Sequence, residues 1–358
     1  MSIAIVYNEP EPVVLARHWL MRSQAADSPP VLEDRAEAGV VTQVEEIRAT
    51  LVELGMRPKL CGVRRGVDLA EFLVRERPNA IFNCCESVGG SAALEMSVAA
   101  LFDLFGIAYT GSPALTLGIA LDKSLAKALF QSAGVPTPAA VAIRTMDELE
   151  RTATPAFPLI VKPLAEDASI GIETASVVLD RTALTERVRF VCSAFPQGAL
   201  VEEFIDGREL NVSLLANSAG VLEPLPVSEV LFEGLDAGTP AIVSYHAKWT
   251  VDSPAYLGTP VRCPAALTQP LSDRVCGAAL AAAAAVNVRD YGRVDLRVRS
   301  SDEAVFVLEV NPNPDLSADA GFMRAARAGG RTYPGTIEQI LSCALNRARS
   351  RGIAADVS

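Results

Sequence analysis

The sequence predicts an α/β fold with a parallel sheet in its first lobe, and three observations support this. Short apolar strands at residues 3–7, 80–82 and 107–109 alternate with a stretch of helical periodicity, as in proteins built from βαβ units. Two later regions contain pairs of apolar, β-branched segments separated by turns. The chain has 358 residues, of which 50% are hydrophobic, so it is long enough for two or three domains with a large shared core.

The expected division into lobes follows the chain. In the first lobe, apolar residues recur at helical spacing at Val40, Val44, Ile47, Leu51 and Leu54. Residues 18–39 lack periodicity and contain two prolines, so we expect a surface loop or a lid over a substrate. Turn residues at 110–113 and 206–207 mark the boundaries. The expected segments are an α/β domain at 1–112, a central lobe at 113–206, a C-terminal lobe with a metal site at 207–345, and a tail at 346–358.

An antiparallel hairpin is the first candidate site. Two apolar, β-branched segments flank the turn at 300–303. Because side chains alternate along a strand, Arg293, Asp295 and Arg297 share one face of the first strand. In the same way, Glu309 and Asn311 share one face of the second. Adjacent carboxylates on apolar strands repel each other unless a cation joins them, and such oxygen ligands suit Mg²⁺ held together with a phosphate. The alternative is a solvated, charged hairpin face.

A strand that ends in a lysine is the second candidate site. Residues 157–163 form a short apolar strand that contains Lys162 near its end, and a small-residue loop follows at 165–171. A lysine beside a flexible loop suits a phosphate better than a core. Further along, His246 and Lys248 are two residues apart, so an extended conformation would place them on one strand face.

The order of these motifs resembles the ATP-grasp superfamily, and specifically its D-alanine–D-alanine ligase-like branch. The motifs that carry the resemblance are Lys162-Pro163 with its loop, Glu202-Glu203-Phe204-Ile205, Gly207-Arg208-Glu209, Arg293-Val294-Asp295 and Glu309-Val310-Asn311-Pro312. Residues 106–114, 121–127 and 133–138 extend the resemblance, which covers about residues 80–345. It implies an α+β ATP-grasp fold, in which an N-terminal pre-ATP-grasp α/β domain precedes two lobes that clamp ATP.

The resemblance also implies roles for individual residues. Lys123 and Lys162 would bind the α- and β-phosphates, and Ser169 would cover the transferring phosphate. Lys248 would lie near the γ-phosphate, and Arg293 would stabilise the acyl phosphate and the oxyanion that follows it. Adenine and ribose would be contacted by Glu202, Glu203, Ile205 and Glu209. Two Mg²⁺ ions, or Mn²⁺ in their place, would be bound by Asp295, Glu309 and Asn311.

The substrate pockets depart from the family pattern. The Gly-Gly-x-Ser-x-Glu-Arg-Glu element of D-alanine–D-alanine ligases is replaced by residues 3–12. The family's tyrosine after its lysine is Trp249 here, and the serine for the second substrate's carboxylate is Ala320. Asn83 and Glu86 follow an apolar strand, where an α/β sheet presents its ligand crevice, although this segment could instead cap the next helix. The candidate substrate contacts are Asn83, Glu86, Asn313, Asp315 and Ser317.

These features predict an ATP-dependent carboxylate–amine ligase that forms an amide through an acyl phosphate and releases ADP and phosphate. Its partners would be small-molecule acids and amines, namely amino acids or specialised metabolites other than D-alanine. One alternative is true D-alanine–D-alanine ligation in cell-wall synthesis. Another is a phosphotransferase with a hydroxyl acceptor, in which Arg293 would have no evident purpose.

Composition indicates the setting of the enzyme. A net charge of −11 disfavours nucleic acid or an anionic membrane as a partner. No apolar run is long enough to span a membrane, and the first residues lack the features of a signal peptide, so a cytoplasmic location is expected. Seven cysteines without metal-like spacing suggest a reducing compartment, with the adjacent Cys84 and Cys85 as packing residues. The resemblance is also compatible with a homodimer.

Overall fold

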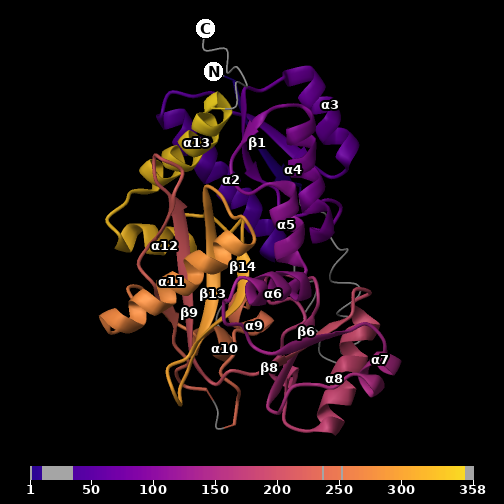
Figure 1. Ribbon diagram of the computed structural model, residues 1–358. Coiled ribbons are helices and arrows are strands. Elements are labelled where there is room, and N and C mark those ends of the chain that lie inside the picture. Colours follow the sequence, from indigo (N-terminus) through magenta and orange to yellow (C-terminus); the bar gives the residue numbers. More distant parts are fainter. Residues whose placement is uncertain (1, 10–34, 236–237, 251–252, 351–358) are drawn as a thin grey trace.

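Three sheets with their covering helices make up the protein in the computed structural model (Figure 1). The structure describes residues 2–9, 35–235, 238–250 and 253–350. The predicted α/β class is confirmed, and each sheet falls within one of the three expected segments. The lobe boundaries themselves stay a prediction. None of the helices in these residues has the length and apolar character needed to cross a membrane.

The first lobe contains a parallel sheet in the strand order β2-β1-β3-β4. Its strands are β1 (Ile3–Asn8), β2 (Lys59–Val63), β3 (Ala80–Cys84) and β4 (Ala108–Tyr109). The covering helices are α2 (Arg35–Glu53), α3 (Gly66–Glu76) and α4 (Glu95–Leu104). Ile3 and Ile5 of β1 belong to the core shared with α2, and Ala4 and Val6 belong to the core shared with α3 and α4. Both faces of the strand are therefore buried, which explains its unbroken apolar run.

Two expectations about the N-terminal region are modified. The strand β2 is absent from the predicted set, because its five residues begin with exposed positions and contain a glycine. Most of the insertion expected at 18–39 lies outside the described residues. The exception is 35–39, which forms the start of α2 rather than a loop.

The second lobe contains an antiparallel sheet in the order β5-β8-β6-β7. Its strands are β5 (Ala140–Ile143), β6 (Leu159–Pro163), β7 (Val177–Val178) and β8 (Ala199–Glu203). Its helices are α7 (Met146–Arg151) and α8 (Arg181–Ala194), and α8 packs against β6. The connection from the first lobe consists of α5 (Ala114–Leu121) and α6 (Lys123–Ser132). Short 3₁₀ helices lie at Ala92–Leu94 and Thr174–Ser176.

The third lobe contains an antiparallel sheet in the order β12-β11-β9-β13-β14, with β10 paired to the far part of β9. Its strands are β9 (Gly207–Ala216), β10 (Leu222–Pro224), β11 (Ser228–Val230), β12 (Val261–Arg262), β13 (Tyr291–Arg299) and β14 (Val305–Asn311). Its helices are α9 (Tyr245–Trp249), α10 (Pro254–Leu257), α11 (Gln269–Ala285) and α12 (Gly321–Ala328). The alanine-rich face of α11 packs closely on β13 and β14 because its side chains are small.

The last helix returns to the first lobe. Helix α13 (Tyr333–Ser350) packs on β4 and α2, and Figure 1 shows it beside α2 in the first lobe. Arg347 of α13 donates a hydrogen bond of 2.7 Å to the carbonyl oxygen of Tyr109 and forms an ion pair with Asp290. The expected tail therefore begins as helix through residue 350, and its remainder lies outside the described residues. These contacts join the first and third lobes.

Gly207 is the junction between the second and third lobes and carries a specific prediction. Its φ is +147°, and a Cβ added there would lie 2.0 Å from the carbonyl oxygen of Val298 on the neighbouring strand. Gly207→Ala should therefore lower the free energy of unfolding by roughly 2–4 kcal/mol, because β9 and β13 must separate. Chemical denaturation measures this change.

The matched control for this prediction is Gly220→Ala. Gly220 has a φ of +81° and nothing within 4 Å of an added Cβ. It should lose only about 1 kcal/mol, from the left-handed conformation alone. Equal losses in the two variants would contradict the steric explanation.

Candidate active site

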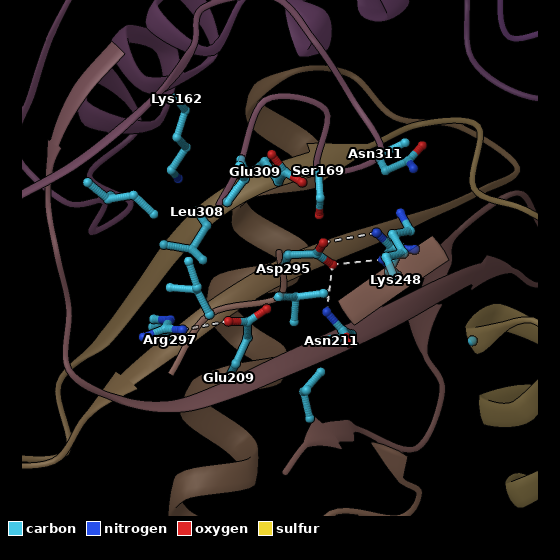
Figure 2. A pocket seen from close by; sticks show the side chains of 18 of the residues that line it. Lys162, Ser169, Glu209, Asn211, Lys248, Asp295, Arg297, Leu308, Glu309 and Asn311 are labelled. Atoms are coloured by element: carbon cyan, nitrogen blue, oxygen red, sulfur yellow. Dashed lines mark hydrogen bonds and ion pairs between the residues drawn. The ribbon is translucent and has the colours of Figure 1, made fainter. Parts of the chain in front are cut away.

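The main cavity, of about 280 Å³, lies between the second and third sheets (Figure 2). We call it the first cavity. Strands from both sheets supply its walls, so two chain segments more than 100 residues apart face each other across it. Of the residues predicted to bind nucleotide or metal or to act in catalysis, all line this cavity except Lys123.

The hairpin of β13 and β14 has the predicted register. Asp295 lies opposite Glu309, and Arg293 lies opposite Asn311. The guanidinium of Arg293 forms a bidentate ion pair with Asp295. Its Nε donates a hydrogen bond of 2.7 Å to Oδ1, and one Nη donates a hydrogen bond of 2.9 Å to Oδ2. Asn211 of β9 donates a further hydrogen bond of 2.9 Å to Asp295 Oδ1. Burial raises the pKa of Asp295, but Arg293 outweighs it and lowers that pKa below its ordinary value. The carboxylate is therefore charged at neutral pH.

Glu202 lies at the centre of a buried ion-pair cluster. Its two carboxylate oxygens each lie 2.7 Å from a lysine ammonium, one from Lys162 and one from Lys127. The Glu202 side chain is 1% exposed. Burial alone would raise its pKa, but the two lysines outweigh this and hold the pKa at about 2. The cluster fixes Lys162 with its ammonium at the wall of the first cavity.

Arg297 shapes the connection between the two lobes. Its guanidinium donates to the carbonyl oxygen of Ile205 at 2.8 Å and to Glu209 Oε2 at 2.7 Å. It also lies 5.0 Å from the centre of the Phe204 ring, a cation–π contact. One buried arginine thus orients the predicted adenine-binding backbone and the predicted ribose-binding carboxylate. Glu203, in the same connection, is more open and lies 3.8 Å from an arginine of β13.

Lys123 reaches the site from a different direction. It is the first residue of α6, and the Asp122 side chain caps that helix by accepting from two backbone N–H groups. The Lys123 ammonium donates to the carbonyl oxygen of Glu166 and lies 3.9 Å from Glu309 Oε2. It therefore approaches the metal-ligand candidates without lining the first cavity.

The small-residue loop after β6 is held against α9. Ala168 and Ser169 have φ values of +56° and +61°, which is unusual for residues with a Cβ. The indole N–H of Trp249 donates a hydrogen bond of 2.9 Å to the carbonyl oxygen of Ala168. Backbone strain of this kind persists where surrounding structure holds it and is frequent at ligand-binding loops. Ser169 lines the first cavity, and its role at the transferring phosphate stays a prediction.

The expectation that Lys248 lies on a strand is wrong. Residues Tyr245–Trp249 form the short helix α9, and the Ser244 hydroxyl caps its start by accepting a hydrogen bond from the backbone N–H of Ala247. Positions two apart on a helix point in different directions, so His246 is exposed while Lys248 faces the cavity near Asp295 (Figure 2). Burial lowers the pKa of Lys248, and the neighbouring Arg293 lowers it further.

A second cavity, of about 240 Å³, lies where the three lobes meet. We call it the substrate chamber. Asn8, Glu86 and Glu95 line it from the first lobe. Pro312, Asn313 and Asp315 line it from the segment after β14. It shares six lining residues with the first cavity: Asp167, Ala168, Lys248, Arg293, Asn311 and Gly321. The two cavities therefore meet beside the Lys248 ammonium and the Arg293 guanidinium.

Of the predicted substrate contacts, Glu86, Asp315 and Asn313 line the chamber. The Asn313 side chain already has hydrogen-bond partners. Its amide N–H donates a hydrogen bond of 3.0 Å to Glu95 Oε1, and its oxygen accepts one of 2.8 Å from the Tyr291 hydroxyl. It therefore ties the third lobe to the first. Asp315 accepts hydrogen bonds from the backbone and side chain of Ser317.

Asn83 and Ser317 are buried and do not line the chamber. The Asn83 oxygen accepts from the N–H of Cys85 and shapes the turn that leads to Glu86. Cys84 and Cys85 are fully buried, and burial raises the pKa of both thiols, which agrees with the predicted packing role.

Four further residues of the site are given no role in the sequence prediction: Lys127, Glu95, Asp167 and Arg297. Lys127 follows Lys123 by four positions on a helix, a spacing that places both on one face. Arg297 follows Asp295 by two positions on a strand, so alternation places it on the same face. The sequence carried a signal for these two. Glu95 and Asp167 depend on contacts between lobes, for which no local pattern exists.

Comparison with known proteins places this geometry in a family. Residues 129–342 match the family model described as the C-terminus of D-ala D-ala ligase. A D-alanine–D-alanine ligase of Stutzerimonas stutzeri is 31% identical over 79% of this chain and 83% of its own. An uncharacterized protein, y4sG, of Sinorhizobium fredii is 34% identical over 86% of this chain and 89% of its own.

Solved structures agree on the fold. The crystal structure of D-alanine–D-alanine ligase from Bacillus anthracis in complex with ATP superposes with a TM-score of 0.72 at 22% identity, and covers 98% of this chain and 99% of that one. The family model spans more than half of the chain, and the relatives align along most of their length. This chain therefore belongs to the D-alanine–D-alanine ligase-like family of the ATP-grasp superfamily, the ATP-dependent ligases that form carbon–nitrogen bonds.

Proposed function

We propose that the protein activates the carboxylate of a small-molecule acid with ATP and joins it to an amine, through an acyl phosphate. The observation that carries this proposal is the junction of the two cavities at Lys248, Arg293 and Asn311. A nucleotide in the first cavity and an acid in the chamber would bring the γ-phosphate and the carboxylate to that junction. Such positioning accounts for much of the catalysis of phosphoryl transfer.

ATP suits the first cavity. Lys162 and Lys248 offer ammonium groups to the phosphates, and Ser169 stands in a loop beside them. At the end of the first cavity away from these phosphate contacts, the Ile205 backbone would contact the adenine and the Glu209 carboxylate would contact the ribose. Glu202 and Glu203 would lie beside the adenine. Lys123, next to Glu309, would complete the set of phosphate contacts.

A divalent cation fits the hairpin. Asp295 and Glu309 lie opposite each other, and Asn311 adds an amide oxygen one alternate position away. This is a sparse set of protein ligands. The described residues contain no group of three or more acidic, histidine or cysteine side chains placed so that they could hold a metal ion. Mg²⁺ is commonly held by one or two carboxylates together with substrate phosphates and water, so the set is adequate for Mg²⁺ with ATP. The ion would neutralise phosphate charge during transfer.

The chain's own residues would serve both chemical steps. In the first, the acid's carboxylate oxygen attacks the γ-phosphorus and ADP leaves, while Lys248 and Arg293 balance the negative charge. In the second, a neutral amine attacks the acyl carbon and an oxyanion forms. The bond from that carbon to the phosphate oxygen then breaks, and the proton lost by the nitrogen leaves with the phosphate. The Arg293 guanidinium is held rigidly by Asp295, so it is preorganised for that oxyanion.

Two substrate assignments compete. The named relatives favour D-alanine for both sites. The chamber favours other substrates, because Trp249 and Ala320 stand where D-alanine–D-alanine ligases carry a tyrosine and a serine, and Glu86 and Asp315 face the space. We adopt the second assignment.

The test is phosphate release from Mg²⁺-ATP in a panel of single amino acids, amines and acids and their pairs, with mass spectrometry of the products. Hydroxylamine, added in place of the amine, should trap the acyl phosphate as a hydroxamate. An amide with D-alanine alone would support the family's named activity instead. A phosphorylated alcohol as product, without a hydroxamate from any acid, would identify a phosphotransferase and overturn the proposal.

A further inference from the structure

The substrate chamber is strongly acidic. Five carboxylates line it, namely Glu86, Glu95, Glu166, Asp167 and Asp315. The lysine and arginine among its lining residues are Lys248 and Arg293, and both stand at the junction with the first cavity. The end of the chamber away from the junction is therefore negative and carries no cationic side chain among its lining residues.

Most acidic residues of the chamber lack a strong cationic partner. No ion pair within 4.0 Å is formed by Glu86, Asp167 or Asp315 within the described part of the chain, and the Glu86 carboxylate accepts no hydrogen bond there. Glu86, Asp167 and Asp315 are exposed residues whose side chains line the chamber. Burial, followed by the charge of Asp315, raises the pKa of Glu86 to about 8. Carboxylates held this way repel one another until a cation arrives.

A second observation points to a cationic ligand. The Trp249 indole lines the chamber and is held there by its hydrogen bond to Ala168. The ammonium of Lys248 lies 5.3 Å from the centre of this ring. Aromatic faces attract ammonium groups. An amino acid's terminal carboxylate, in contrast, would find no arginine or lysine at the far end of the chamber.

We propose that the amine substrate of this enzyme is a small molecule with a second, protonated amino group, such as a diamine or a basic amino acid, and that Glu86 and Asp315 bind this group. The proposal rests on the ligase function and specifies its acceptor. One amino group would stand neutral near Arg293 and attack the acyl phosphate. The other would stay protonated among the carboxylates and orient the molecule.

Direct binding tests the proposal without requiring turnover. The full chain is loaded with Mg²⁺ and a non-hydrolysable ATP analogue, and ligands are added in matched pairs during calorimetric titration. The pairs are 1,4-diaminobutane against 1-aminobutane, and lysine against norleucine, each amino acid in both enantiomers. The dicationic or basic member should bind about tenfold or more tightly than its partner, because it alone carries the additional ammonium group that Glu86 and Asp315 can bind.

Variants connect the effect to the chamber. Glu86→Gln and Asp315→Asn should each weaken binding of the basic ligand about tenfold while leaving binding of the ATP analogue unchanged. Glu150→Gln is the control, because Glu150 is exposed on α7 and is not among the residues that line the chamber. Since the Glu86 charge is unfavourable in the folded protein, Glu86→Gln should fold normally, and its melting temperature verifies this.

The outcomes separate this inference from the proposed function. Equal affinity within both pairs, or unchanged binding in Glu86→Gln and Asp315→Asn, would overturn the acidic acceptor site. Amide formation with neutral amines only would do the same and leave the ligase function intact. Tight binding of the basic ligands without amide or hydroxamate from any acid would support the site and reject the ligase proposal.

The pH dependence of stability offers an additional check. A glutamate whose pKa is higher in the folded than in the unfolded protein destabilises the fold as it ionises. For Glu86 this loss should develop as pH rises from its ordinary value of 4.5 toward about 8. Thermal unfolding across this range should show that Glu86→Gln loses less stability than the wild type. Identical profiles would contradict the raised pKa.

Discussion

Glu309→Ala is expected to reduce Mg²⁺-ATP-dependent phosphate release by about 10³-fold while the protein stays folded. The reason is that Glu309 lies opposite Asp295 and would supply one of two carboxylates for the divalent cation. The Glu309 side chain is 36% exposed, and its ion pair with Lys123 is long, with 3.9 Å between the ammonium nitrogen and Oε2. The fold should therefore depend little on Glu309. Initial rates at several Mg²⁺ concentrations measure the effect, and the half-saturating concentration should also rise.

Glu150→Ala is the control for this experiment, because it removes an exposed carboxylate on α7. It should retain the wild-type rate and the wild-type Mg²⁺ dependence. Circular dichroism and thermal unfolding establish that both variants are folded. A folded Glu309→Ala protein with normal turnover would remove the metal assignment of the hairpin.

Glu202→Gln is expected to lower the free energy of unfolding by about 3–5 kcal/mol at neutral pH, the largest stability loss among our predictions. The substitution leaves the ammonium groups of Lys127 and Lys162 buried without the carboxylate that now joins them. Denaturant unfolding measures the loss. Weaker binding of ATP should accompany it, because Lys162 would lose the contact that positions it.

The pH dependence gives the Glu202 prediction a second test. The folded-state pKa of about 2 lies below the ordinary value of 4.5, so the ion pairs stabilise the fold fully above pH 4.5. Their contribution is lost as pH falls from 4.5 toward 2, and the difference between wild type and variant should shrink over that range. Glu203→Gln is the control, since this neighbour is 34% exposed and its contact with Arg299 is 3.8 Å, so little change is expected.

Local periodicity predicted the parts of the site that lie within one supersecondary unit. The alternation of side chains along two strands was enough to bring Arg293, Asp295, Glu309 and Asn311 to one face, and the register agrees. The parallel sheet of the first lobe followed in the same way from apolar strands and a helical repeat. Lys248 shows the limit of this reasoning. Five residues are too few to distinguish a strand from a helical turn by periodicity alone. The hydrogen bond from the helix start to the Ser244 side chain favours the helix.

The sequence by itself therefore determined the family and predicted most of the residues that line the first cavity, because these depend on short-range patterns in a recognisable order. The tertiary structure decided what surrounds them. It placed Glu202 between Lys127 and Lys162, and it joined two cavities at Lys248 and Arg293. It also gathered carboxylates from three lobes into one chamber. Such long-range contacts fix burial and charge balance, and these determine which substrate the enzyme accepts.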